Sequence, residues 1–310
     1  MSTGAGGGGK AVVAALSANL AIAVAKLVGF LITGSSSMAA EAVHSFADSG
    51  NQVLLLVGGN RARRDADEQH PFGYGRERYF YAFAVAVVLF TLGALFAIYE
   101  GIDKIRHPHA LETPTVAIAI LVFALVAEGF SFRTAVREAA PLRQGISWLA
   151  YVRRATAPEL PVVLLEDCAA LVGLVLALLG VGLALLTGQA VFDGIGTLCI
   201  GLLLGAVAAL LAVEMKALLI GEAASPESVQ AVRAALVDGA TVLRVIHLKT
   251  MHLGPDELLV AAKLALAPGL ALPAVARAID DAEARVRAAE PLARSMYLEP
   301  DLDRTPVPQV

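Results

Sequence analysis

Three ionisable side chains interrupt one apolar stretch of the sequence in a helical pattern. Glu41, His44 and Asp48 fall within an arc of about 60° on a helix of ~3.6 residues per turn. An imidazole and a carboxylate four residues apart can hold one divalent ion, and this donor set suits zinc and its first-row neighbours better than calcium or magnesium. The alternative interpretation is a polar pair that hydrogen-bonds to neighbouring helices.

A second pair of acids lies in another apolar stretch, in the order Val-Leu-Leu-Glu166-Asp167-Cys168. Ionisable groups in a membrane span cost about 2.5 to 3.5 kcal/mol each on insertion scales, so each is a functional hypothesis. Adjacent helical residues point about 100° apart, so we expect only one of the two acids to face the cavity of His44 and Asp48. Cys168 is expected to be a buried, small apolar residue rather than a thiolate ligand.

Polar residues elsewhere in the apolar stretches carry weaker signals. We expect Lys26 to pair with a carboxylate or to extend to the membrane surface, and Asp193 to orient the helices near it. Glu128 is a candidate for the lining of an ion pathway.

A polar segment from Asp65 to Arg76 is the most distinctive stretch of the sequence. Asp67 and His70 lie among other acids and could bind a metal transiently, while His-Pro-Phe-Gly-Tyr-Gly predicts a tight turn. The alternative, which we weigh equally, is a turn whose acids neutralise nearby arginines.

These candidates lie in a chain that is 57% hydrophobic and only 17% charged over its 310 residues. This balance is far from that of a water-soluble enzyme. Six windows are each long enough to cross about 30 Å of hydrocarbon. The second window is the least apolar because it carries the stripe of ionisable residues. The windows are 11–33, 38–59, 79–100, 114–133, 161–187 and 192–220.

The distribution of basic residues predicts the orientation of these spans. Arginines gather between spans two and three and between spans four and five, and such loops face the cytoplasm. The first and fifth connections contain no basic residue. We therefore expect six spans with both termini cytoplasmic.

The composition changes after Gly221, where a smaller soluble domain is predicted. Its pattern indicates helix 226–238, strands 242–252 and 257–266, helix 272–289 and strand 294–299. The order αββαβ gives a small sheet with both helices on one face. We thus expect a flexible, glycine-rich tail without a removable signal peptide (1–10), a transmembrane domain (11–220), a cytoplasmic domain (221–303) and a loose tail (304–310).

The charge and cysteine content exclude other classes of protein. The formal net charge of −4 gives no basic field for nucleic acid. Both cysteines, Cys168 and Cys199, lie inside apolar runs, where a disulfide framework is not expected.

The motifs together resemble the cation diffusion facilitator family of divalent-metal transporters. The resemblance rests on Ser-Ser-Met-Ala-Ala-Glu41-Ala-Val-His44-Ser-Phe-Ala-Asp48, on His70-Pro-Phe-Gly-Tyr-Gly-Arg, on the six spans and on the αββαβ segment. The segments around Asp167 and from His252 to Lys263 look most like the branch that includes zinc transporter nine. The resemblance covers the chain beyond its glycine-rich start.

The resemblance implies a homodimeric antiporter that exchanges a cytoplasmic metal ion for protons at a site between spans two and five. His44 and Asp48 match the span-two ligands, and Asp167 matches the span-five carboxylate. The fourth ligand position is Val163, so Glu166, Glu41, Asn51 or water is left as the remaining donor.

The cytoplasmic metal positions of the family match only in part. Asp67 and His70 match loop ligands, but Tyr74 replaces a later histidine. The binuclear site of some bacterial members corresponds to Ile246, Ala262 and Tyr297, with only Glu299 near a matching acid. We expect no strong binuclear zinc site, a metallochaperone-like fold, and His247 and His252 as sheet residues.

The function predicted from these observations is export of a divalent metal by proton antiport, without enzymatic activity or a resident cofactor. Zn²⁺ is expected first, with Mn²⁺, Fe²⁺, Co²⁺ and Cd²⁺ as other candidates. His44, with an ordinary pKa of about 6.5, is the natural proton carrier, with Glu166 as a second.

Two other functions remain open, and the expected location is a membrane. The first alternative is a membrane-anchored, metal-responsive adaptor that transports nothing. The second is intramembrane hydrolysis by metal-activated water, for which no nucleophile motif is present. A multi-pass protein of a bacterial inner membrane is expected from the composition.

Overall fold

The computed structural model describes residues 7–109, 113–143 and 145–302, with side chains from residue 19 onward. The expected tail at 304–310 and residues 1–6 lie outside this part of the chain. The described elements form two compact units. One contains the chain through Asn60 and from Arg78 to Lys216, and the other contains Arg61–Glu77 and the chain from Ala217 onward.

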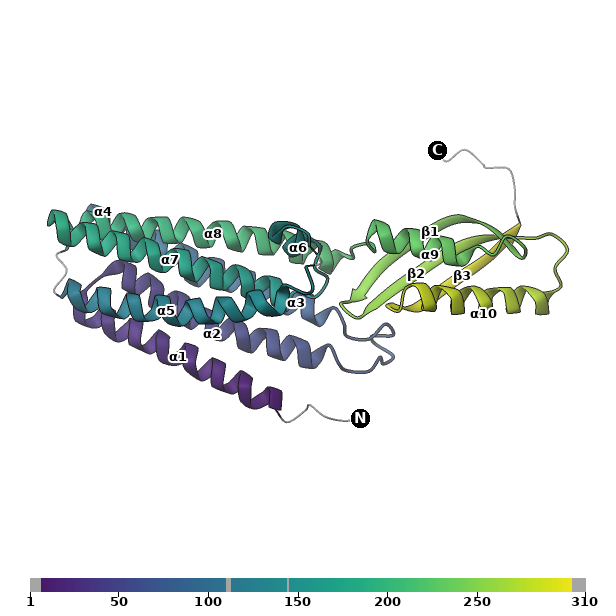
Figure 1. Ribbon diagram of the computed structural model, residues 1–310, viewed down its shortest axis with the longest axis horizontal. Coiled ribbons are helices and arrows are strands. Elements are labelled where there is room, and N and C mark those ends of the chain that lie inside the picture. Colours follow the sequence, from purple (N-terminus) through teal and green to yellow (C-terminus); the bar gives the residue numbers. More distant parts are fainter. Residues whose placement is uncertain (1–6, 110–112, 144, 303–310) are drawn as a thin grey trace. The chain divides into compact units, whose positions relative to one another are not determined.

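The first unit is helical, and its long helices lie side by side in Figure 1. Its elements are α1 (Gly7–Thr33), α2 (Ser36–Arg61), α3 (Glu77–Val88), the π-helical segment η1 (Leu89–Leu95), α4 (Phe96–Arg106), α5 (Pro114–Ala139), α6 (Trp148–Arg154), α7 (Glu159–Thr187) and α8 (Val191–Ile220). The first helix begins at Gly7, inside the glycine-rich stretch that was expected to be a tail.

Four helices of the described chain are long and apolar enough to cross a membrane. They are Glu77–Arg106, which joins α3, η1 and α4, and α5, α7 and α8. In α1 the described apolar part is the shorter stretch Asn19–Thr33. Polar residues keep α2 outside this group, as its sequence predicted. The chain is therefore an integral membrane protein, and the count of six spans remains a prediction.

Two features of the helical unit were not predicted from the sequence. The π-helical turn η1 interrupts a helix that was expected to be regular. The short helix α6 begins after Ser147, whose hydroxyl accepts a hydrogen bond from the Ala150 N–H. Such a side-chain cap satisfies one of the free N–H groups at a helix start.

The second unit contains a three-stranded sheet and two helices in the predicted order αββαβ. Its elements are α9 (Pro226–Leu236), β1 (Val242–Gly254), β2 (Glu257–Leu266), α10 (Leu272–Ala289) and β3 (Ala293–Leu302). The strand order is β1-β2-β3, with β2 antiparallel to β1 and parallel to β3. The parallel pair requires a crossover connection, which α10 provides.

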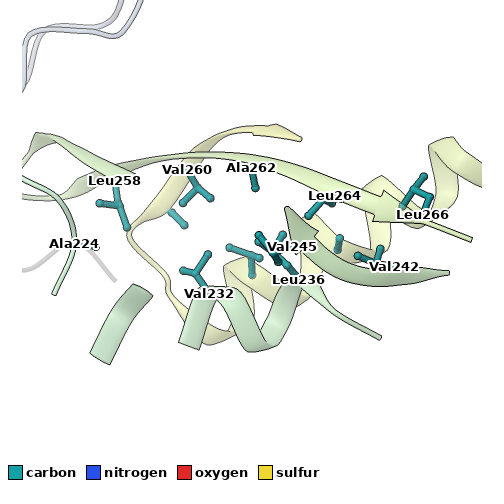
Figure 2. Packing of buried hydrophobic residues seen from close by; sticks show 13 residues of the cluster. Ala224, Val232, Leu236, Val242, Val245, Leu258, Val260, Ala262, Leu264 and Leu266 are labelled. Carbon is teal, nitrogen blue, oxygen red and sulfur yellow. The ribbon is translucent and has the colours of Figure 1, made fainter. Parts of the chain in front are cut away.

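The core of the second unit lies between the sheet and its helices. Figure 2 shows Val232 and Leu236 of α9 directed toward Val260 and Leu264 of β2, and all four are fully buried. Alternate residues of β2 are buried, as expected for a strand with one covered face. The prediction that the helices share one face of the sheet is confirmed by the contact between α9 and α10.

The polar segment Arg61–Glu77 packs against the hairpin of the second unit. A Cβ atom on Gly75 would lie 2.8 Å from the Leu253 carbonyl oxygen, so glycine allows this close approach. Nearby, the Arg76 guanidinium lies 3.1 Å from the Met251 sulfur, and the Phe72 and Tyr297 rings meet edge to face. The segment is thus attached to β1 and β3 by backbone and ring contacts.

Candidate metal centre in the helical unit

The polar stripe of α2 is buried in the helical unit. His44 is fully buried, and its Nδ1 lies 3.4 Å from Oδ1 of Asp48 on the next helical turn. Within the described chain, neither ring nitrogen of His44 has a hydrogen-bond partner, and Oδ1 of Asp48 has none either. Buried polar atoms are rarely left unsatisfied, so these three atoms are suited to accept a metal ion.

Both acids of α7 reach the same pocket, although helical spacing predicted only one. The pocket is lined by Asp48 and, from α7, by Val163, Glu166 and Asp167. Glu166 Oε1 accepts a hydrogen bond of 2.7 Å from the Asn51 amide. Asp48 and both α7 acids therefore line one pocket between α2 and α7, the two helices that were predicted to form the site.

Helix α5 adds polar groups that the sequence did not place at this site. Glu128 lines the pocket, and the Ser131 hydroxyl donates a hydrogen bond of 3.0 Å to Asp167 Oδ2. Glu128 could be recognised from its isolation in an apolar stretch, whereas Ser131 carried no such signal. The serine hydroxyl thus fixes one oxygen of Asp167.

The position of the missing fourth donor, Val163, can be located in the structure. Val163 lines the pocket one helical turn before Asp167, and its side chain also packs beside the apolar residues around Leu164. A valine offers no lone pair to a metal. Asn51, a proposed substitute, directs its amide nitrogen to Glu166. Cys168 is a free, exposed cysteine of α7, so the expectation of a buried apolar side chain is wrong.

Glu41 lies nearer the start of α2 than His44 does, and it has a different partner. Its Oε2 lies 3.0 Å from the Lys26 ammonium of α1, and both side chains are fully buried. The predicted pairing of Lys26 with a carboxylate is thus confirmed. Among the described residues, no three His, Cys, Asp or Glu side chains are close enough together to hold a metal ion. Of the candidate ligands, Asp48, Glu166 and Asp167 line the pocket, whereas His44 and Glu41 are not part of its lining.

The loop candidates Asp67 and His70 form a closed turn. Asp67 Oδ1 accepts hydrogen bonds from the Gln69 and His70 N–H groups, and Oδ2 accepts one of 2.6 Å from the Tyr74 hydroxyl. The hydrogen bond from Tyr74 and the main-chain bonds hold the pKa of Asp67 below its usual range, and the same bond raises the pKa of Tyr74. Both carboxylate oxygens of Asp67 already accept hydrogen bonds within the turn. Metal binding by this loop remains a prediction.

The C-terminal histidines lie in β1, as predicted. His247 is exposed and His252 is buried, and burial lowers the pKa of His252. Glu299, the acid near the family's binuclear site, pairs with Lys263 at 2.9 Å. Lys263 also lies 3.2 Å from Asp301, and its pKa is raised by these two carboxylates.

The long apolar helices, their buried acids and the αββαβ unit are the features of an integral membrane protein with a smaller mixed α and β unit. Residues 12–220 match the family described as the cation efflux transmembrane domain. The chain belongs to the cation efflux family, as its motifs predicted.

Several curated relatives are similar to most of this chain. The proton-coupled zinc antiporter SLC30A9, mitochondrial, of Xenopus laevis is 38% identical over 243 residues, which is 78% of this chain and 43% of the relative. The human protein of the same name is 35% identical, covering 80% of this chain and 44% of the relative. Metal tolerance protein C4 of Arabidopsis thaliana is 30% identical, covering 80% and 55%.

These comparisons bear on the branch and on the location. The similarity to the zinc antiporters confirms the branch that the motifs indicated. The chain spans about half the length of these relatives or less. Two of them carry the word mitochondrial in their names, so they do not support the bacterial inner membrane that the composition suggested.

Proposed function

We propose that this chain exports a divalent metal ion, Zn²⁺ first, in exchange for protons. The ion binds between α2 and α7, with His44, Asp48 and Asp167 as its ligands and Glu166 as an additional donor. The similar proteins are named proton-coupled zinc antiporters, which supports zinc as the ion and protons as the coupled species. The observation that carries the site is the buried His44 imidazole, whose two nitrogens lack partners beside an acid-lined pocket in the described chain.

The donor atoms explain how the ion and protons would exchange. Imidazole and carboxylate groups bind zinc only when deprotonated, so protons compete with the metal for the same atoms. Because the candidate ligands are not gathered into a cluster, metal binding draws α2 and α7 together around the pocket. Protonation from the opposite side of the membrane then releases the ion.

The remaining parts of the proposal concern topology and assembly. Six helices, α1, α2, the α3–α4 helix, α5, α7 and α8, cross the bilayer, and both termini lie on the side that supplies the metal. The arginine-rich connections support this orientation. The αββαβ unit has a metallochaperone-like fold and supports a homodimer.

Metal uptake into proteoliposomes with an imposed pH gradient tests the function. Reconstituted wild type should take up Zn²⁺ when protons can move the other way. The double substitution His44→Ala, Asp48→Ala should reduce this flux by about 100-fold, because two ligands are lost. Uptake of Mn²⁺, Fe²⁺, Co²⁺ and Cd²⁺, measured in the same assay, shows which ion the protein transports fastest.

The chain provides a matched control for that double substitution. His107 and Asp103 form another pair four residues apart, with Nδ1 and Oδ1 3.1 Å from each other, but their side chains are 66% and 47% exposed. Replacing both by alanine should leave the flux unchanged. Absence of flux of every ion in wild type would refute export and favour the adaptor function.

A further inference from the structure

A lysine is buried among the apolar residues of α1 beside the candidate metal pocket. Lys26 is fully buried, and its ammonium contacts Oε2 of Glu41 at 3.0 Å and the hydroxyl of Ser45 at 2.7 Å. Both partners belong to α2, one turn apart. An ammonium group in a membrane span is expensive to bury, and such residues are usually functional. The lysine therefore joins α1 to the helix that carries His44 and Asp48.

Glu41 is held in place from a second side. Its Oε1 has no hydrogen-bond partner in the described chain and lies against Gly173 of α7. A Cβ atom at Gly173 would be only 2.6 Å from this oxygen, so the glycine leaves the space that the carboxylate occupies. Glu41 is thus enclosed between α1 and α7 and directed toward Lys26.

Ser45 connects this ion pair to the pocket. The serine lines the pocket and follows His44 directly in the chain. The ionisable residues that line the pocket are all acids: Asp48, Glu128, Glu166 and Asp167. Lys26 therefore places one fixed positive charge at the edge of an acidic site for a divalent cation.

Elementary electrostatics gives this charge two effects on a bound metal ion. The ammonium repels the cation, and this repulsion is strong because the surroundings have a low dielectric constant. The ammonium also engages Glu41, which would otherwise be a fifth carboxylate able to approach the ion. Both effects weaken metal binding, and a transporter needs binding that is weak enough for release.

We propose that Lys26 is a positioning residue that keeps Glu41 out of the ligand set and limits the affinity of the site for its metal. This inference rests on the proposed function of zinc transport at the α2–α7 pocket. It assigns Glu41 the role of counter-ion to Lys26 instead of that of a ligand.

Zinc affinity in variants of the full chain tests the inference by the direction of the change. Lys26→Met removes the positive charge and frees Glu41, so the Kd for Zn²⁺ measured by calorimetry in detergent should fall by about tenfold or more. Glu41→Gln leaves the ammonium uncompensated, so the Kd should rise by a similar factor. The double variant Lys26→Met, Glu41→Gln should return to within about threefold of wild type.

Transport by the same variants separates this role from a purely structural one. In proteoliposomes, Lys26→Met should lower the KM for Zn²⁺ together with the maximal rate, because release of the ion becomes slow. Lys26→Arg keeps the charge and should retain most of the wild-type KM. A brace without an electrostatic role would lower the amount of folded protein and the flux in proportion, at constant KM and Kd.

The outcomes distinguish this inference from the function on which it rests. If wild type transports zinc but Lys26→Met and Glu41→Gln shift the Kd in the same direction, or leave it unchanged, the inference is wrong. If Lys26→Met does not fold, an unaltered Kd in Glu41→Gln overturns it equally. Wild type that neither binds nor moves zinc refutes the proposed function itself.

Discussion

Asp193 at the start of α8 holds the start of α2 through a buried carboxylate. Its Oδ2 accepts hydrogen bonds from the Ser36 N–H at 2.9 Å and the Ser36 hydroxyl at 3.1 Å. Its Oδ1 accepts from the Ser35 hydroxyl at 2.9 Å and the Ser37 N–H at 3.3 Å. A carboxylate at a helix N-terminus satisfies free N–H groups and interacts favourably with the helix dipole.

The substitution Asp193→Ala should therefore destabilise the helical unit strongly. It leaves the buried N–H groups of Ser36 and Ser37 without their acceptor, at a cost of about 1–3 kcal/mol for each group. We expect a loss of about 4 kcal/mol in total, because Asp193 is fully buried and water cannot replace it. At roughly 2–4 °C per kcal/mol, the midpoint of thermal unfolding in detergent should fall by about 10 °C.

A single hydroxyl provides the control for this prediction. Ser35→Ala removes the hydroxyl hydrogen bond to Asp193 and the hydrogen bond that this hydroxyl accepts from the Met38 N–H at 3.3 Å, but it leaves both N–H contacts of Asp193, so its effect should be about 1–2 kcal/mol. Asp193→Asn should fall between the two, since an amide retains one acceptor oxygen. An unchanged unfolding midpoint for Asp193→Ala would refute the reasoning that this carboxylate anchors α2.

Three further predictions concern the pocket and the C-terminal unit. Gly75→Val places side-chain atoms against the hairpin backbone, so it should destabilise that packing by about 1–3 kcal/mol and speed proteolysis of the loop, whereas unaltered proteolysis would contradict the contact. Burial lowers the pKa of His252 in the folded state, so at acidic pH the unfolded chain binds a proton more readily than the folded chain. The stability contributed by the neutral imidazole is therefore complete above the unfolded pKa of about 6.5 and is lost as pH falls through the folded pKa. Thermal unfolding between about pH 5 and 7.5 should become flatter in His252→Gln but not in the exposed control His247→Gln. Val163→His adds a donor to the pocket wall and should tighten zinc binding in calorimetry by roughly tenfold, and no change would argue against metal binding at this wall.

The sequence predicted the elements where local pattern determines structure. Alternation in β2 and the 3.6-residue period in α10 specify a sheet with one covered face, and the observed order matches. The stripe from Glu41 to Asp48 lies in α2 as the spacing required. His44 and Asp48 were identified because ionisable residues in an apolar helix are too expensive to be incidental.

The parts that were missed depend on contacts between distant segments. The 100° spacing of Glu166 and Asp167 predicted one acid in the pocket, but both acids line it together with residues of other helices. A carboxylate partner for Lys26 was expected, but the sequence did not identify it as Glu41, because this pair joins two helices and leaves no local pattern. The π-helical segment η1 was also missed, because its sequence resembles that of an ordinary apolar helix.

X-ray absorption at the zinc edge, on the full chain loaded with one equivalent of Zn²⁺, tests the central claim most directly. The account predicts a first shell of nitrogen and oxygen donors, with the multiple-scattering signature of one imidazole that disappears in His44→Ala and persists in His107→Ala. A spectrum that keeps its imidazole signature in His44→Ala, or a shell dominated by sulfur, would contradict metal binding between α2 and α7.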